Sequence, residues 1–153
     1  MPQPFDIVEM PAILIAAVPC KARQHDIPQT LVAGLDKVYA VLRKRGARSG
    51  RSVAVYTDMT DGMVTFRAGV EVEAPFAPEG EVAASTTPGG RAAHVVHLGD
   101  YSTMAATTMA AMQAMTAQKL PIVGPNWEVY GAPEEDPAKR RVDIYFRLKD
   151  QGA

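Results

Sequence analysis

The chain has 153 residues, a formal net charge of −1 and a pI near 6.3. Hydrophobic residues make up 47% and charged residues 22%, which is typical of an ordinary globular protein. This near-neutral charge gives no electrostatic support for nucleic-acid binding. No segment approaches the roughly 20 consecutive apolar residues of a membrane span, and the N-terminus lacks the features of a signal peptide. We therefore expect a cytoplasmic protein that binds neither nucleic acid nor membrane directly.

Cysteine and histidine give no support for a metal or redox site. Cys20 is the single cysteine, which excludes an intrachain disulfide and a cysteine-based zinc site. His94 and His97 are three residues apart on a predicted strand, so their side chains face opposite sides and cannot chelate one ion. The glycines follow no phosphate-loop pattern. We expect no metal and no cofactor.

The first half of the chain predicts strand, helix, strand, strand. Residues 11–18 form an apolar, β-branched run that we expect to end at Pro19. Residues 29–45 carry apolar side chains at spacings of three and four, and Gly46 is their expected stop. Residues 53–55 and 64–72 alternate in polarity around the turn residues 57–62, which predicts a hairpin.

The second half repeats this order after a segment at 74–90 that has three prolines, three glycines and no periodicity. We interpret that segment as a linker. Residues 92–98 then predict a strand, residues 101–118 a methionine-rich helix, and residues 127–130 with 142–148 a second hairpin. One domain spanning 1–153 is expected, with halves at about 5–73 and 91–149.

The predicted fold class is α+β. Two strand-helix-strand-strand modules would form one antiparallel sheet, with both helices on one face and a concave groove on the other. Strand alternation places Tyr145 opposite the apolar side chains of 142, 144, 146 and 148, which we expect to face the helices. Tyr56 alternates with Val53 and Val55, and Glu128 alternates with Trp127 and Val129. We therefore expect Tyr56, Glu128 and Tyr145 to share the face without helices.

Glu128 is the most informative single residue, because it is a carboxylate within the aromatic, β-prone run 126–130. A charge is costly away from water unless it is paired or hydrogen-bonded. Two interpretations fit this pattern. Glu128 lies on the solvent face of an edge strand, or it lies in a binding pocket where it recognises or protonates a ligand.

The sequence resembles the GyrI-like small-molecule-binding domain, the effector-binding domain of AraC- and MerR-type multidrug regulators, which has a SOUL-like tandem fold. The resemblance covers roughly residues 5–149. It rests on the order and spacing of short phrases at 7–12, 54–58, 66–70, 97–101, 127–130 and 142–148.

The resemblance implies a pocket for cationic, lipophilic ligands with a glutamate at its base. Glu128 matches that position, and the aromatic walls correspond to Tyr56, Tyr101 and Tyr145, with Trp127 less clearly placed because of its parity. Met104 and Met112 from the second helix are further candidates for the wall, although methionines at helical spacing also suit a core.

Three functions are compatible with the resemblance. The first is a standalone drug- or effector-binding protein. The second is a hydrolase that opens strained cyclopropane rings with Glu128 as the catalytic residue, so enzymatic activity is left open. The third is a protein that binds gyrase or a separate regulator, and a homodimer is equally compatible. The chain shows no helix-turn-helix segment, so it does not read as a complete transcription regulator.

Overall fold

The structure is a computed structural model that describes residues 4–75, 77–132 and 134–150. These residues form eight strands and two α-helices. In order they are β1 (Asp6–Met10), β2 (Leu14–Arg23), α1 (Ile27–Arg45), β3 (Ser52–Thr60), β4 (Met63–Glu71), β5 (Ala83–Thr86), β6 (Gly90–Leu98), α2 (Met104–Ala117), β7 (Asn126–Tyr130) and β8 (Arg141–Arg147). Short 3₁₀ turns, Gln24–Asp26, Tyr101–Thr103 and Pro137–Lys139, precede α1, α2 and β8.

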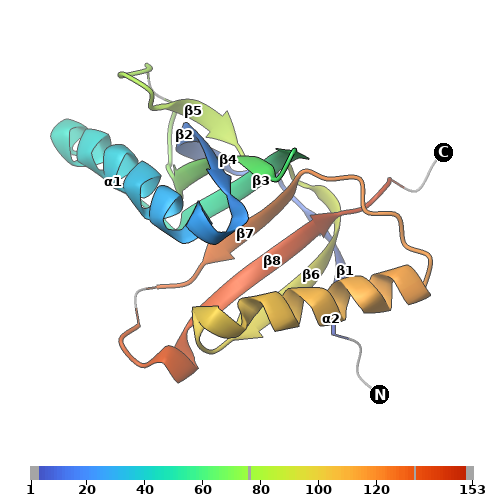
Figure 1. The fold of residues 1–153 in the computed structure, drawn as a ribbon. Coiled ribbons are helices and arrows are strands. Elements are labelled where there is room, and N and C mark those ends of the chain that lie inside the picture. The colour runs from blue at the N-terminus through green and yellow to red at the C-terminus, as the bar shows by residue number, and fades with distance from the viewer. Residues whose placement is uncertain (1–3, 76, 133, 151–153) are drawn as a thin grey trace.

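All strands join one antiparallel sheet in the order β1-β6-β8-β7-β3-β4-β2-β5. The predicted repeat is confirmed, as β2-α1-β3-β4 and β6-α2-β7-β8. Both helices lie on one face, where Tyr130 contacts the core beneath α1 as well as the core beneath α2 (Figure 1). No helix within the described ranges is long and apolar enough to cross a membrane.

The helices form where the sequence predicts them. Leu31, Val38 and Leu42 of α1 are buried against β2 and β4. Gly46 ends α1 with a φ of 64°, a left-handed conformation that glycine adopts without steric cost. In α2, Ala111 and Met115 are buried against β6 and β8, whereas Met109 and Met112 are exposed.

A bent two-stranded ribbon joins the two edges of the sheet. β1 pairs with β6, and β2 pairs with β5, in one continuous register in which residue 10 faces 90 and residue 14 faces 86. Between these pairs, Ile13 and Thr87 exchange hydrogen bonds of 2.8–2.9 Å. Each strand of the ribbon therefore runs through both halves of the domain.

Two sequence expectations about strands are wrong. The predicted linker at 74–90 contains β5, whose four residues gain their partners from β2. The first strand does not end at Pro19 but continues to Arg23. β5 pairs only with residues 14–17 of β2, so Pro19 lies beyond the end of β5. The N–H that proline lacks therefore costs no hydrogen bond between β2 and β5.

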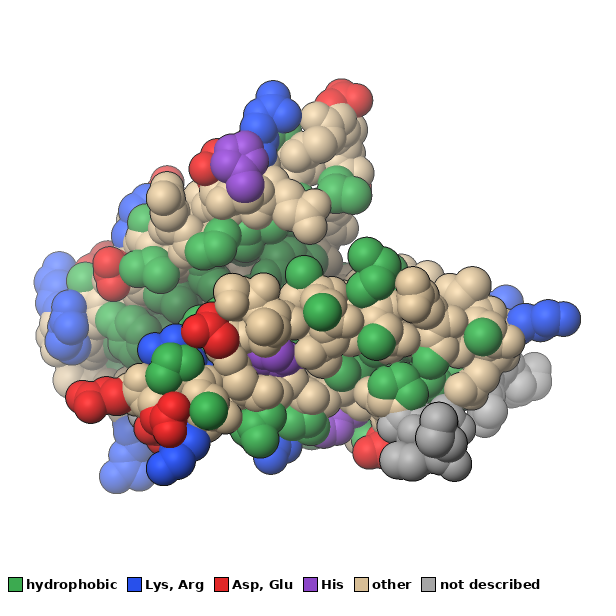
Figure 2. All heavy atoms as spheres, turned by 60° about the horizontal axis from the view of Figure 1, so that its bottom comes forward, with side chains coloured by type: hydrophobic (Ala, Val, Ile, Leu, Met, Phe, Trp, Pro, Cys, Tyr) green, Lys and Arg blue, Asp and Glu red, His purple; other side chains and the backbone are tan. Residues whose placement is uncertain are grey.

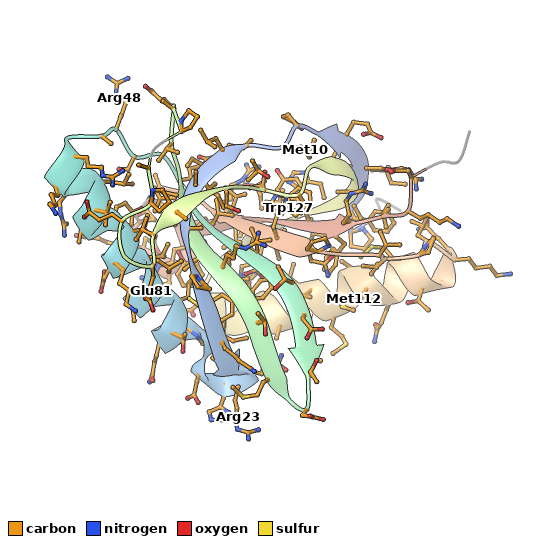
Figure 3. The ribbon with its side chains drawn as sticks, turned by 90° about the horizontal axis from the view of Figure 1, so that it is seen from above. Met10, Arg23, Arg48, Glu81, Met112 and Trp127 are labelled. Carbon is orange, nitrogen blue, oxygen red and sulfur yellow. The ribbon has the colours of Figure 1, made fainter. Side chains whose placement is uncertain are left out.

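The face of the sheet without helices is a core rather than an open groove. It buries Ile15, Val53, Val55, Trp127 and Tyr145. Met10 of the ribbon packs on this cluster close to Trp127 (Figure 3). The predicted concave groove on this face is therefore wrong, because the ribbon covers it.

Candidate ligand-binding site

The principal cavity lies on the helix-bearing face, between α1 and the start of α2. It has a volume of about 890 Å³. Figure 2 shows hydrophobic side chains gathered in this hollow. The described residues that line it come from four stretches of the chain and are Gln24, Ile27, Pro28, Leu31, Val32, Leu35, Tyr39, Gly50, Arg51, Ser52, Tyr56, Tyr101, Met104, Glu128, Tyr130, Gly131 and Ala132.

Glu128 is the single carboxylate among these lining residues. It lies on β7 directly across from Ala54 of β3 and Ile144 of β8, so neighbouring strands flank it on both sides. The hydroxyls of Tyr56 and Tyr130 each donate to Glu128 Oε1 at 2.8 Å. Both of these hydrogen bonds go to Oε1, and no described residue donates to Oε2. Every fully buried side-chain oxygen of the described residues has a hydrogen-bond partner, so Oε2, which has none, is not fully buried. Oε2 therefore meets the open cavity.

Burial raises the pKa of the Glu128 carboxyl above its ordinary value of 4.5, against the opposing effect of the two tyrosine hydroxyls. Burial also raises the pKa of Tyr56 and of Tyr130, and the neighbouring carboxylate raises both further. The two hydroxyls therefore keep their protons and act as donors. The site couples one proton-binding carboxylate to two fixed donors.

The charges around the cavity leave Glu128 without a cationic partner. Arg51 is the single cation among the described lining residues, and its guanidinium is held by Glu71 at 2.9 and 3.1 Å. A carboxylate whose second oxygen faces an apolar cavity without a counter-ion is a strong point of attraction for a ligand that brings a positive charge.

Tyr101 forms part of the mouth of the cavity. It follows β6 in the 3₁₀ turn before α2, and 47% of its surface is exposed. Its ring lies edge-on to Tyr130 at 6.2 Å, and the guanidinium of Arg140 lies 5.3 Å from its centre. Arg140 also donates to the carbonyl of Glu134 at 3.1 Å. The mouth is therefore held between the turn before α2 and the β7–β8 loop.

The structure brings together Tyr56, Tyr101, Met104 and Glu128 of the predicted site residues, since all four line the cavity. Two other predicted residues do not join them. Tyr145 and Trp127 lie on the opposite face, stacked on each other with centroids 4.8 Å apart. Their register explains this, because Trp127 pairs with Tyr145 while Glu128 pairs with Ile144.

Met112 also lies apart from the cavity. It is 41% exposed and points away from the sheet on the outer side of α2 (Figure 3). Of the two methionines expected in the pocket wall, Met104 alone lines the cavity. Met104 is the first residue of α2.

Sequence reasoning missed Tyr130 and the contribution of α1. Tyr130 is two residues after Glu128 on the same strand, so period-two alternation alone places it on the same face. The α1 wall includes Ile27, Leu31, Leu35 and Tyr39, each four residues after the last, together with Pro28 and Val32. That spacing is visible in the sequence for Leu31, Leu35 and Tyr39, which lie in the predicted helix, but the prediction gave this helix no part in the pocket.

The histidines face opposite sides of β6, as predicted. His94 bonds to Asp143 at 2.7 Å and stacks on Tyr145, whereas the His97 ring bonds to Thr107 of α2 at 2.7 Å. The described residues contain no cluster of three or more side chains suited to a metal ion.

Burial raises the pKa of the Cys20 thiol, which disfavours a reactive thiolate.

Comparison with known families settles the relationship suggested by this geometry. The model of the GyrI-like small molecule binding domain matches residues 3–149. The chain belongs to the GyrI-like family. No curated protein has significant sequence similarity to this GyrI-like chain.

Several solved structures share the GyrI-like fold. The C-terminal domain of EcmrR has a TM-score of 0.78 and 14% identity, covering 98% of this chain and 99% of that one. In the EcmrR–DNA complex the TM-score is 0.80 at 14% identity, and the alignment covers 95% of this chain but 57% of the longer EcmrR chain. A hydrolase from Listeria innocua has a TM-score of 0.67 and 12% identity over 97% and 94% of the two chains.

A further structure, SAV2435 bound to tetraphenylphosphonium, has a TM-score of 0.64 and 10% identity, covering 95% of this chain and 93% of that one. At these identities the likeness establishes the fold. Together with the family match, it shows a small-molecule-binding domain.

Proposed function

We propose that this protein binds amphipathic, cationic or aromatic small molecules in the cavity between α1 and the start of α2, with Glu128 as the recognition carboxylate. The observation that carries the proposal is the environment of Glu128. Its Oε1 is held by two tyrosine hydroxyls, its Oε2 faces the cavity, and no described cation neutralises it.

Charge and shape together favour a flat or bulky lipophilic cation. The lining is dominated by apolar and aromatic side chains, which stabilise the body of such a ligand by removing its surface from water. Tyr56, Tyr101 and Tyr130 offer ring faces or edges to a positive charge. A ligand cation at Oε2 would supply the missing partner and favour the ionised carboxylate.

Tetraphenylphosphonium, the ligand of the neighbour SAV2435, has this chemistry: it is a permanent cation enclosed by four aromatic rings. That likeness supports the choice of tetraphenylphosphonium as the first probe for this protein.

Calorimetric titration with tetraphenylphosphonium tests the proposal. We expect saturable binding that Glu128→Gln weakens about tenfold or more, because a charge-assisted contact is lost. Glu9→Gln on exposed β1 removes the same charge away from the cavity and should leave the affinity within about twofold. Unchanged binding in Glu128→Gln, or no saturable binding of lipophilic cations at all, would contradict the proposal.

A second candidate, hydrolysis of an activated ring, is favoured by one observation. Burial raises the Glu128 pKa, so the carboxyl holds a proton at higher pH than usual and could deliver it to a leaving group as a general acid. Turnover separates the two functions. A hydrolase would convert substrate in excess over protein and lose rate in Glu128→Gln, whereas a binding protein would capture its ligand without releasing product.

A further inference from the structure

Besides Glu128, the cavity contains a second polar position, formed by Tyr39 of α1 and Ser52 of β3. Their hydroxyls are 2.8 Å apart, and both residues line the cavity. They lie at the end of the cavity beside the α1–β3 connection, where Gly50 and Arg51 complete the wall.

The hydroxyl pair has unused hydrogen-bonding capacity. Each hydroxyl carries one proton and two lone pairs, and their mutual bond consumes one proton and one lone pair. Neither hydroxyl has another partner among the described residues. One proton and several lone pairs therefore remain for a group that enters the cavity.

The strand register sets the distance between the two polar positions. Ser52 precedes Ala54 by two residues on the same face of β3, and Ala54 lies directly across from Glu128. Two residues along a strand and one strand spacing across give a separation of roughly 8 Å between the backbone positions of Ser52 and Glu128.

An apolar wall runs past both positions. The α1 residues that line the cavity run from Ile27 to Tyr39, an advance of twelve residues along the helix that corresponds to ~18 Å. The cavity is therefore elongated along α1, and it can hold more than a compact cation at Glu128.

We propose that the cavity recognises a ligand with two ends: a lipophilic cation at Glu128, and a hydrogen-bonding oxygen, such as a hydroxyl, carbonyl or ether, at the Tyr39–Ser52 hydroxyl pair. This inference rests on the proposed function and specifies its ligand class. The chain between the two polar ends lies along the apolar wall of α1.

A matched pair of probes tests the second end: hexyltriphenylphosphonium and its ω-hydroxyhexyl form, which differ by one terminal oxygen. The measured quantity is the ratio of the two dissociation constants in the same protein. Combining Tyr39→Phe with Ser52→Ala should reduce the preference for the hydroxylated probe about threefold to tenfold relative to the parent, the range of one net hydrogen bond. Ser52→Thr keeps a hydroxyl and should keep the ratio.

The outcomes distinguish the two proposals. If both probes bind and both weaken in Glu128→Gln, but the ratio is the same in the parent and in the double variant, the cation site stands and the second position is overturned. If neither probe binds the parent, the proposed function itself fails. Thermal unfolding of each variant, which should stay close to that of the parent, verifies that a changed ratio reflects recognition rather than loss of fold.

Discussion

Trp127 and Tyr145 stack almost parallel across the β7–β8 pair, with their planes 14° apart, on the face of the sheet turned away from Glu128. His94 stacks on the other side of Tyr145 at 4.8 Å. Both aromatic residues are buried, at 2% and 7% exposure, and the ribbon covers them. This stack therefore belongs to the core, and its removal should affect stability rather than ligand recognition.

Replacing Trp127 with alanine should lower the free energy of unfolding by about 3–5 kcal/mol, the usual cost of emptying a buried aromatic position. Urea denaturation followed by circular dichroism measures this loss. Tyr101→Ala, at a half-exposed position, should cost about 1 kcal/mol or less. Equal losses in the two variants would mean that Trp127 is not part of a tightly packed core.

The position of Trp127 also predicts a weak optical signal. Its indole lies beneath Met10 on the far side of the sheet from the cavity, so a bound cation cannot stack on it. We expect tetraphenylphosphonium at saturation to change the tryptophan emission by a small fraction only, while calorimetry reports full binding. Strong quenching that saturates with the calorimetric curve would place the ligand on the wrong face for the proposed site.

Affinity for a permanent cation should rise with pH. Burial raises the Glu128 pKa above 4.5, and the neutral carboxyl cannot pair with a cation. Binding should therefore strengthen as the pH passes from 4.5 upward through the raised pKa and then reach a plateau. Calorimetric titration across this range measures the midpoint, and Glu128→Gln should abolish the dependence.

Removing the hydroxyl of Tyr56 should move that midpoint to higher pH. The hydroxyl stabilises the ionised carboxylate by donating to Oε1, so its loss in Tyr56→Phe raises the Glu128 pKa further. Tyr145→Phe changes a tyrosine outside the cavity and serves as the matched control. Identical midpoints in all three proteins would show that the Tyr56 contact does not stabilise the charged form.

Stability should show the opposite trend with pH. The folded protein holds the Glu128 proton more tightly than the unfolded chain does, so raising the pH from 4.5 through the raised pKa lowers the free energy of unfolding. Glu128→Gln removes this loss, because a glutamine side chain does not ionise. Its amide oxygen can still accept the hydrogen bonds from Tyr56 and Tyr130. We expect Glu128→Gln to be more stable than the parent at neutral pH, with the difference shrinking below pH 4.5.

The order of elements was predictable because each carries its own local signal. The stripe on α1, the stop at Gly46 and the alternation in β8 are such signals, and the structure confirms them. β5 was not predictable, because Ala83–Thr86 has no marked alternation and becomes a strand through its pairing with β2. Long-range pairing of this kind leaves no trace in the residues themselves.

The faces of β3 and β7 could not be assigned from alternation alone. Alternation correctly separates Glu128 from Trp127, but it does not say which set faces the helices. The prediction placed Val53 and Trp127 on the side that faces the helices, and Glu128 on the side without helices. In the structure both faces of these strands are covered, by the helices on one side and the ribbon on the other, so hydrophobicity no longer distinguishes them.

The ribbon that runs through both halves has a mechanical consequence. A hinge motion between the halves would have to bend both strands of the ribbon at once. These strands keep one continuous register and are hydrogen-bonded to each other where they pass between the halves, at Ile13 and Thr87. The spacing between the walls of the cavity is therefore set by the backbone. For the proposed site, we therefore expect ligands of different bulk to be accommodated by lining side chains such as Met104 and Tyr101, rather than by a change in the backbone frame.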